Sequence, residues 1–118
     1  MSKQTLEDLK QELKEFAQAR DWEQFHSPKN LSMALSVEAS ELVEHFQWMT
    51  EEQSAHLDDE KHAAVALEMA DIFIFLLRLS ERMNVDLMKV TRQKIALNHQ
   101  RYPVSKVKGS SKKYSEYT

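Results

Sequence analysis

Apolar residues recur along this chain with the 3.6-residue spacing of α-helices, and no segment alternates polar and apolar residues long enough to predict a strand. The pattern predicts four main helices, at about residues 5–20, 27–48, 58–83 and 86–102, and a short helical piece at 50–53. One glycine and two prolines leave few places for turns. We therefore predict an all-α fold, a four-helix bundle-like domain.

Capping residues stand where these helices should begin. They are the capping boxes Thr5–Asp8 and Thr50–Gln53, Ser27 followed by Pro28, Asp58 or Asp59, and Asp86. Pro103 lies just beyond the last helix, and a polar, basic segment follows it. We predict a helical domain over residues 1–103 and a basic C-terminal tail, mobile unless anchored, over residues 104–118.

The third helix is apolar on every side. Between residues 63 and 77, Glu68 and Asp71 are the only residues that are not apolar. Such a helix is buried, and a domain of this size has little to cover its outer side, so we expect a symmetric homo-oligomer. The two acids and the charged flanks argue against a membrane span. The absence of cysteine and of an N-terminal signal region fits a cytoplasmic protein.

Two carboxylate pairs sit where the pattern calls for hydrophobic core: Glu38 with Glu41, and Glu68 with Asp71. Spacing i, i+3 lets both acids of a pair project the same way, so two facing helices can direct four acids to one point. Two carboxylates about 5 Å apart repel by roughly 3 kcal/mol at an effective dielectric of about 20. A hard dication, Mg²⁺ with Mn²⁺ as a substitute, would reverse that repulsion.

A structural alternative exists for these acids. Arg78 and Arg82 follow Asp71 on the same predicted helix and could fold back to pair with the four carboxylates. In that case the acids would hold the fold together rather than bind metal.

Charge is distributed unevenly along the chain. Residues 1–86 carry 18 acids and 8 Lys or Arg, whereas residues 87–118 carry 8 Lys or Arg and one acid. A nucleoside triphosphate with its Mg²⁺ would use both halves, and a nucleic-acid binder would use only the basic one.

Several side chains near the carboxylates suit a planar, charged substrate. Trp22 and Trp48 could stack on a base or could simply pack at the ends of the bundle. His26 could contact a substrate or hydrogen-bond within its loop. Lys94, Asn98 and Arg101 share one helix face, which could bind phosphates or face solvent.

Three stretches, DWEQFHSPKNLSMALSVEASELVEHFQW, EMADIFIFLLRL and NVDLMKVTRQKIALNHQRYP, together resemble the MazG-like all-α nucleoside triphosphate pyrophosphatases. The closest branch is the small dCTP pyrophosphatases, and the resemblance covers about residues 5–103. It implies a helical dimer or dimer of dimers, such as a homotetramer. It also implies Mg²⁺-dependent cleavage of the α–β bond of a deoxynucleoside triphosphate to a monophosphate and pyrophosphate, as in cleansing of the nucleotide pool.

The resemblance also implies a role for each site residue. The metal ligands would be Glu38, Glu41, Glu68 and Asp71, with Glu38 or Glu41 as the catalytic base. The base and sugar would contact Trp22, Glu23, Gln24, Phe25, His26, Trp48 and Phe75. The phosphates would contact Lys94, Asn98, Arg101 and Tyr102.

Some positions depart from the family. In the animal dCTP branch a histidine takes the place of Leu13 and a tyrosine that of Phe75, which leaves open dCTP or a close analogue. Other members often have a doubled glutamate where this chain has Val37 and Glu38.

Two other functions fit parts of the sequence. A di-iron carboxylate bundle would need Glu-x-x-His on two helices, and neither Glu41 nor Glu68 has a histidine three residues later. A non-catalytic helical module could bind nucleic acid through the basic region. We expect a nucleotide substrate and no stable nucleic-acid partner.

Overall fold

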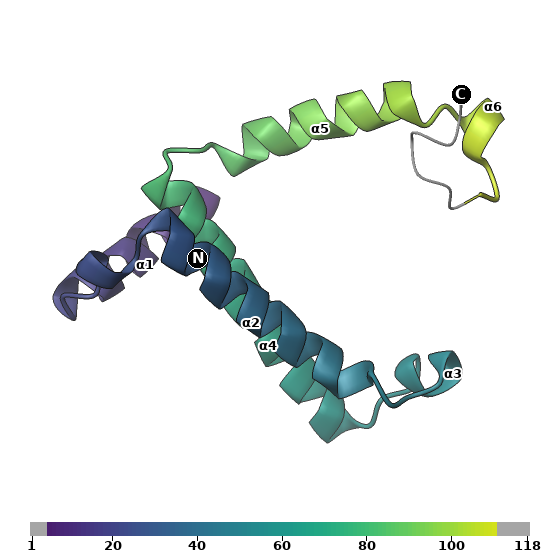
Figure 1. The fold of residues 1–118 in the computed structure, drawn as a ribbon, viewed down its shortest axis with the longest axis horizontal. Coiled ribbons are helices and arrows are strands. Elements are labelled where there is room, and N and C mark those ends of the chain that lie inside the picture. Colours follow the sequence, from purple (N-terminus) through teal and green to yellow (C-terminus); the bar gives the residue numbers. More distant parts are fainter. Residues whose placement is uncertain (1–4, 111–118) are drawn as a thin grey trace. The chain divides into compact units, whose positions relative to one another are not determined.

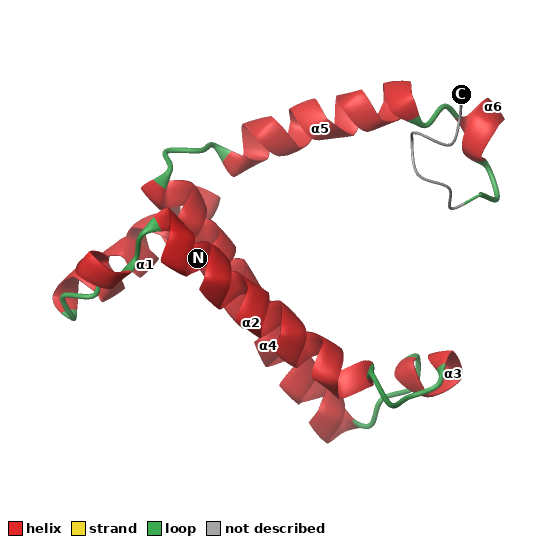
Figure 2. Ribbon diagram, in the orientation of Figure 1, coloured by secondary structure: helices red, strands yellow, loops and turns green. Residues whose placement is uncertain are grey.

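The computed structural model describes residues 5–110, and every regular element in this part of the chain is a helix (Figures 1 and 2). The elements are α1 (Leu6–Ala19), the 3₁₀-helix η1 (Glu23–Phe25), α2 (Pro28–Phe46), α3 (Glu51–Ser54), α4 (Asp59–Arg82), α5 (Leu87–Arg101) and α6 (Val104–Val107). The predicted all-α class is confirmed. Helix α6 occupies the start of the predicted tail, and residues 111–118 of that tail lie outside the described residues.

The predicted caps begin the main helices. Thr5 and Asp8 form a reciprocal capping box on α1, with two hydrogen bonds of 3.1 Å. Ser27 caps α2 by accepting the Asn30 backbone N–H at 3.1 Å. At α4 the cap is Asp58 rather than Asp59, because the Asp58 carboxylate accepts the Lys61 N–H at 2.8 Å. Side-chain oxygens thus satisfy backbone donors that a helix start leaves free.

The chain divides into two compact units, residues up to Asn84 and residues from Val85 onward. Asn84 itself has a φ of 54°, in the left-handed region that asparagine tolerates better than most residues. In the first unit α2 and α4 run antiparallel along each other, and α1 packs on α4 (Figure 1). This helix pair is the scaffold on which the two carboxylate pairs stand.

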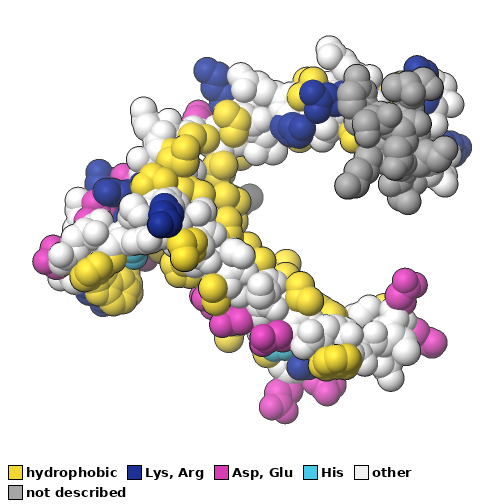
Figure 3. Space-filling model, viewed as in Figure 1, with side chains coloured by type: hydrophobic (Ala, Val, Ile, Leu, Met, Phe, Trp, Pro, Cys, Tyr) yellow, Lys and Arg dark blue, Asp and Glu magenta, His cyan; other side chains and the backbone are white. Residues whose placement is uncertain are grey.

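The core of the first unit is small. Its buried apolar residues are Ala17 on α1, Leu31 on α2, and Val65 and Leu77 on α4. Many large apolar side chains remain exposed on the α2–α4 pair of a single copy, among them Met33, Val37, Val43, Leu67, Met69 and Phe73. Figure 3 shows apolar side chains following the length of this pair. The outer side of α4 is therefore as apolar as its pattern predicted, and one copy leaves it uncovered.

The second unit consists of α5 and α6 in the described residues. Asp86 caps α5 by accepting the Lys89 N–H at 3.1 Å. None of the residues of α5 is buried, and its apolar side chains Met88, Val90 and Ile95 are exposed. Across residues 5–110, the structure contains no helix with the combination of length and apolar character that crossing a membrane requires.

Candidate functional site

Three carboxylates from two packed helices meet at one point. Helix α2 contributes Glu38 and Glu41, helix α4 contributes Glu68, and each offers an oxygen atom within 4.8 Å of the other two. The i, i+3 spacing puts Glu38 and Glu41 on one face of α2, and the antiparallel packing sets Glu68 opposite them. We call these three residues the carboxylate cluster.

The cluster holds negative charge that its surroundings do not offset. Glu38 Oε2 and Glu68 Oε1 are buried, and neither accepts a hydrogen bond in the structure. The adjoining Glu68 raises the pKa of Glu38 above its usual 4.5, because a proton on Glu38 would supply the donor that the pair lacks; burial adds to this shift. The pKa of Glu41 is raised mainly by its contact with Glu38. Proton uptake or a bound cation would relieve this arrangement.

Asp71, the fourth predicted ligand, lies one turn beyond Glu68 on α4 and is exposed. Its charge contributes to the raised pKa of Glu38, so it acts on the cluster electrostatically. Its oxygens are not among those that come within 4.8 Å of one another. The structure therefore brings three of the four predicted acids together and leaves Asp71 at their edge.

The two arginines that could have neutralised these acids are held elsewhere. Arg78 pairs through Nη2 with Glu23 Oε1 at 3.0 Å and through Nη1 with Glu81 Oε2 at 3.0 Å. Arg82 pairs with Glu23 Oε2 at 2.7 Å. Both arginines therefore connect the η1 loop to the end of α4. Neither forms an ion pair with the carboxylate cluster, so the structure does not support the alternative in which these arginines neutralise the four acids.

A cavity of about 310 Å³ lies between α1, the η1 loop and α4. Its lining is mostly apolar and aromatic and consists of Leu13, Phe16, Ala17, Trp22, His26, Ile74, Phe75 and Arg78. Trp22 meets Phe16 edge to face, with ring centroids 5.7 Å apart. Three of the predicted base contacts thus line the same cavity: Trp22, His26 and Phe75. The volume lies at the lower end of the range of small-molecule sites. We call this space the aromatic cavity.

The two positions that depart from the dCTP branch, Leu13 and Phe75, both line the aromatic cavity. Both are apolar in this chain, so the cavity has fewer polar groups to read a base. The donors of its lining come from Trp22, His26 and Arg78.

Other predicted base contacts lie outside this lining. Glu23 is occupied by the two arginines, and Gln24 donates to the Asp21 carbonyl and carboxylate at 3.0 and 3.1 Å. Phe25 is exposed. Trp48 is 89 % exposed and follows the C-terminal end of α2, whereas Trp22 precedes its start. The 19 residues of α2 span about 28 Å, so one copy does not place both tryptophans on one base.

The predicted phosphate contacts lie on α5 and directly after it, in the second unit. Asn98 and Tyr102 line a groove of about 240 Å³ together with Ile95 and His99. The Tyr102 backbone N–H closes the helix by donating to the Asn98 carbonyl at 2.8 Å. Lys94 and Arg101 are exposed on the same helix. This unit therefore combines cationic groups with a shallow groove of its own.

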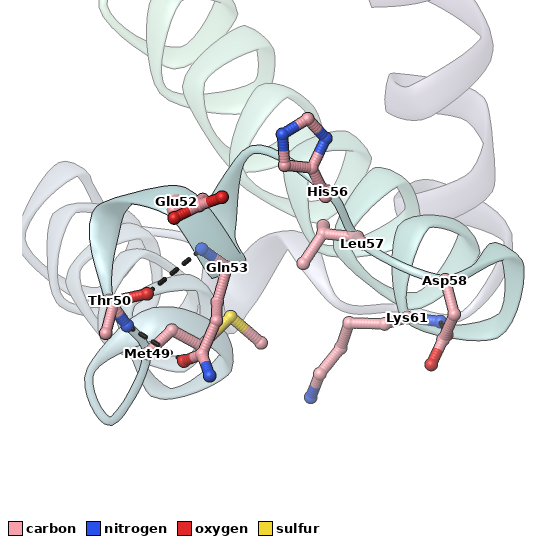
Figure 4. Close-up of a pocket in the computed structure, with 8 residues that line it drawn as sticks. All are labelled: Met49, Thr50, Glu52, Gln53, His56, Leu57, Asp58 and Lys61. Atoms are coloured by element: carbon pink, nitrogen blue, oxygen red, sulfur yellow. Dashed lines mark hydrogen bonds between the residues drawn. The ribbon is translucent and has the colours of Figure 1, made fainter.

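Another cavity, of about 680 Å³, lies beyond the end of α2 (Figure 4). It is lined by Met49, Thr50, Glu52, Gln53, His56, Leu57, Asp58 and Lys61. Two of these residues, Thr50 and Gln53, are joined by the reciprocal bonds of a capping box, and Asp58 caps α4. None of the predicted site residues lines it, and its size alone assigns it no chemistry.

Sequence reasoning missed the part that Arg78 plays. It is only 3 % exposed, lines the aromatic cavity, and holds both Glu23 and His26. The available signal was an arginine within the apolar run of α4, where a buried cation requires partners. The sequence alone could not show which acids pair with Arg78.

Comparisons with known proteins agree with this arrangement. The sequence model of the MazG-like family matches residues 33–117 of this chain. Human dCTP pyrophosphatase 1 is 42 % identical over 114 residues, which cover 95 % of this chain and 67 % of the relative. The bovine protein of the same name is 43 % identical over 117 residues, covering 98 % and 69 %.

A solved structure supports the same relationship. The crystal structure of a pyrophosphatase from Archaeoglobus fulgidus superposes with a TM-score of 0.80 at 31 % identity. The match covers 87 % of this chain and 96 % of that one. The predicted family resemblance is confirmed by these findings together.

The raised pKa of Glu38 predicts how stability changes with pH when divalent cations are removed. A carboxyl whose pKa is higher in the folded state favours folding when protonated, so its contribution is present below about pH 4.5 and is lost as pH rises through the raised pKa. Glutamine cannot ionise. In EDTA, the melting temperature of Glu38→Gln minus that of the wild type should therefore increase as pH rises from about 4.5 to 7.5.

The matched control is Glu15→Gln, an exposed change on α1 that should track the wild type at every pH. A Glu38→Gln variant that is less stable than the wild type near neutral pH would contradict the electrostatic account of the cluster.

Proposed function

Because this chain belongs to the MazG-like family, we propose that it hydrolyses dCTP or a close analogue with Mg²⁺ as its cofactor. The bond cleaved is the one between the α and β phosphates, and the products are a deoxynucleoside monophosphate and pyrophosphate. The enzyme class, a nucleoside triphosphate pyrophosphatase, follows from relatives in sequence and in structure. Its role would be to cleanse the nucleotide pool.

The observation that carries this proposal is the carboxylate cluster with its two buried oxygens that lack a donor. A donor set made only of carboxylate oxygens suits a hard dication, Mg²⁺ or in its place Mn²⁺. Glu38, Glu41 and Glu68 would hold the ion, with Asp71 reaching in from one turn away. Bound there, Mg²⁺ would neutralise phosphate oxygens and lower the pKa of a coordinated water.

Residues of the chain itself would supply the proton acceptor and the base-binding surface. Glu38 or Glu41 would accept the proton of the attacking water, since both belong to the cluster. The aromatic cavity would take the base, with the rings of Trp22 and Phe75 in its lining. Base–aromatic stacking contributes about 1–3 kcal/mol per base, enough to orient a nucleotide.

Helix α4 brings the two parts within reach of one substrate. Glu68 and Phe75 are seven residues apart, two turns on one face, which corresponds to about 10 Å along the axis. A nucleoside with its phosphate chain can bridge that distance. The base would then lie in the aromatic cavity while the phosphates lie at the carboxylate cluster.

The remaining contacts follow from the family resemblance. Lys94, Asn98, Arg101 and Tyr102 would offer donors to the phosphates and offset the charge of the departing pyrophosphate. Trp48 does not line the cavity of its own copy and would therefore reach a nucleotide in an oligomer.

Product analysis tests the reaction directly. The purified chain, incubated with each dNTP and NTP plus Mg²⁺, should convert dCTP fastest and release dCMP and pyrophosphate. EDTA should abolish turnover, because the cluster repels a triphosphate without a cation, and Mg²⁺ should raise the melting temperature by binding the folded state. Release of a diphosphate and orthophosphate would refute the α–β assignment, and full turnover in EDTA would refute the metal site.

We also infer that the chain works as a homo-oligomer, a dimer or a dimer of dimers. Leu67 is 71 % exposed, and Met69 and Phe73 accompany it on α4. Sedimentation at about micromolar concentration should show a species larger than one chain, and Leu67→Glu should shift it toward the monomer by placing a charge in the contact.

Lys29→Glu, an exposed change in the first turn of α2, is the control and should leave the assembly intact. A wild-type monomer with full helicity would show that the exposed apolar face has another explanation.

A further inference from the structure

Two arginines of α4 hold His26 from both ends. Arg78 Nη2 lies 3.2 Å from the ring nitrogen Nδ1 of His26, and Arg82 Nε donates to the His26 carbonyl at 3.0 Å. Glu23 bridges the two guanidinium groups, with contacts of 3.0 and 2.7 Å. His26 is thus fixed in backbone position and in ring orientation by one cluster of charged groups.

The contact with Arg78 determines where the ring carries its proton. A guanidinium group has N–H donors and no acceptor, so Nδ1 must accept the hydrogen bond and cannot itself be protonated. The ring is therefore neutral, and its hydrogen is on Nε2. Within residues 5–110 the ring makes no second hydrogen bond, which leaves the Nε2–H donor unused.

The charged groups around the ring keep it in that state. Burial lowers the pKa of His26 below 6.5, the adjacent Arg78 lowers it further, and Arg82 adds a smaller effect in the same direction. Glu23 acts in the opposite direction but is paired with both arginines. The imidazolium form is consequently disfavoured at neutral pH.

His26 lines the aromatic cavity beside Trp22, with ring centroids 6.3 Å apart. The side chains of Leu13, Phe16, Ile74 and Phe75 are apolar, so the donors of the lining come from Trp22, His26 and Arg78 alone. An N–H donor in such a wall pairs with an acceptor on a planar ring and disfavours a ring that presents a donor or no polar atom there.

We propose that Arg78 is a positioning residue that fixes His26 as the neutral Nε2–H tautomer, and that this N–H donates to the carbonyl oxygen of a pyrimidine base in the aromatic cavity. The base contact rests on the proposed function, whereas the tautomer does not. Arg78 thereby gives a largely apolar cavity a means of selecting a carbonyl-bearing base.

The tautomer is measured first, by ¹⁵N NMR of the histidine side chains, with the His26 signals assigned by their loss in His26→Gln. At neutral pH we expect unprotonated Nδ1, protonated Nε2 and a titration midpoint below 6.5. In Arg78→Met the midpoint should rise and the tautomers should mix, while Arg78→Lys, which keeps a cationic donor, should restore part of the wild-type pattern. A protonated Nδ1 or a cationic ring at neutral pH in the wild type would overturn the proposal.

The base contact is measured by discrimination between dCTP and 2-thio-dCTP, whose sulfur is a weaker acceptor. The wild type should favour dCTP by about tenfold in kcat/KM, mostly through KM. His26→Gln carries an amide N–H near the position of Nε2 and should retain the preference. His26→Met, of similar size but without a donor, should lose it.

These variants keep the test decisive if Arg78→Met fails to fold. Equal discrimination by His26→Met and the wild type would overturn the base contact. If the wild type cleaves neither nucleotide, the proposed function fails and the base contact with it, while the NMR result still decides the tautomer.

Discussion

Like charge held at close range is the constraint on which the rest of this structure depends. Three carboxylates offer oxygen atoms within 4.8 Å of one another on two packed helices, α2 and α4, whose buried residues include Leu31 and Leu77. Like charges at this range repel, and the repulsion is strongest where solvent is excluded, as at the buried oxygens of Glu38 and Glu68. The packing of α2 on α4 opposes that repulsion, and a dication would convert it into attraction.

Helix α4 organises the site because one of its faces carries successive parts of it. Spacings of three and four residues align Glu68, Asp71, Phe75, Arg78 and Arg82 on that face. The first two serve the acidic centre, Phe75 lines the aromatic cavity, and the arginines fasten the loop that completes the cavity wall. A single helix thus fixes the distance between the carboxylate cluster and the aromatic cavity, and exposed apolar residues such as Leu67 lie on its other side.

Much of the fold was predictable because it is encoded locally. Thr5, Ser27 and Asp86 cap the helices they were expected to cap, since capping depends on residues three positions apart. The meeting of Glu38 and Glu68 was also predictable, because acids within apolar stripes face each other when those stripes pack. Here the sequence pattern and the packing impose the same geometry.

The remaining features depend on distances that a sequence does not contain. Arg78 could have paired with Asp71 on its own helix, yet its long side chain turns to Glu23, 55 residues earlier in the chain. The sequence left open whether Trp22 and Trp48 stack on a base, and it could not show that the length of α2 separates them in one copy. Asp71 has the ideal spacing from Glu68, yet it is exposed and lies at the edge of the cluster.

The central claim is that the buried acids bind a metal rather than hold the fold. Glu68→Gln tests it, measured as melting temperature in EDTA alongside kcat with saturating Mg²⁺. The amide is nearly isosteric and removes like-charge repulsion, so we expect a variant no less stable than the wild type that has lost most of its turnover. If Glu68 were a structural ion-pair partner, the change would destabilise the fold by roughly 3–5 kcal/mol. A large fall in melting temperature with turnover retained would contradict the metal site.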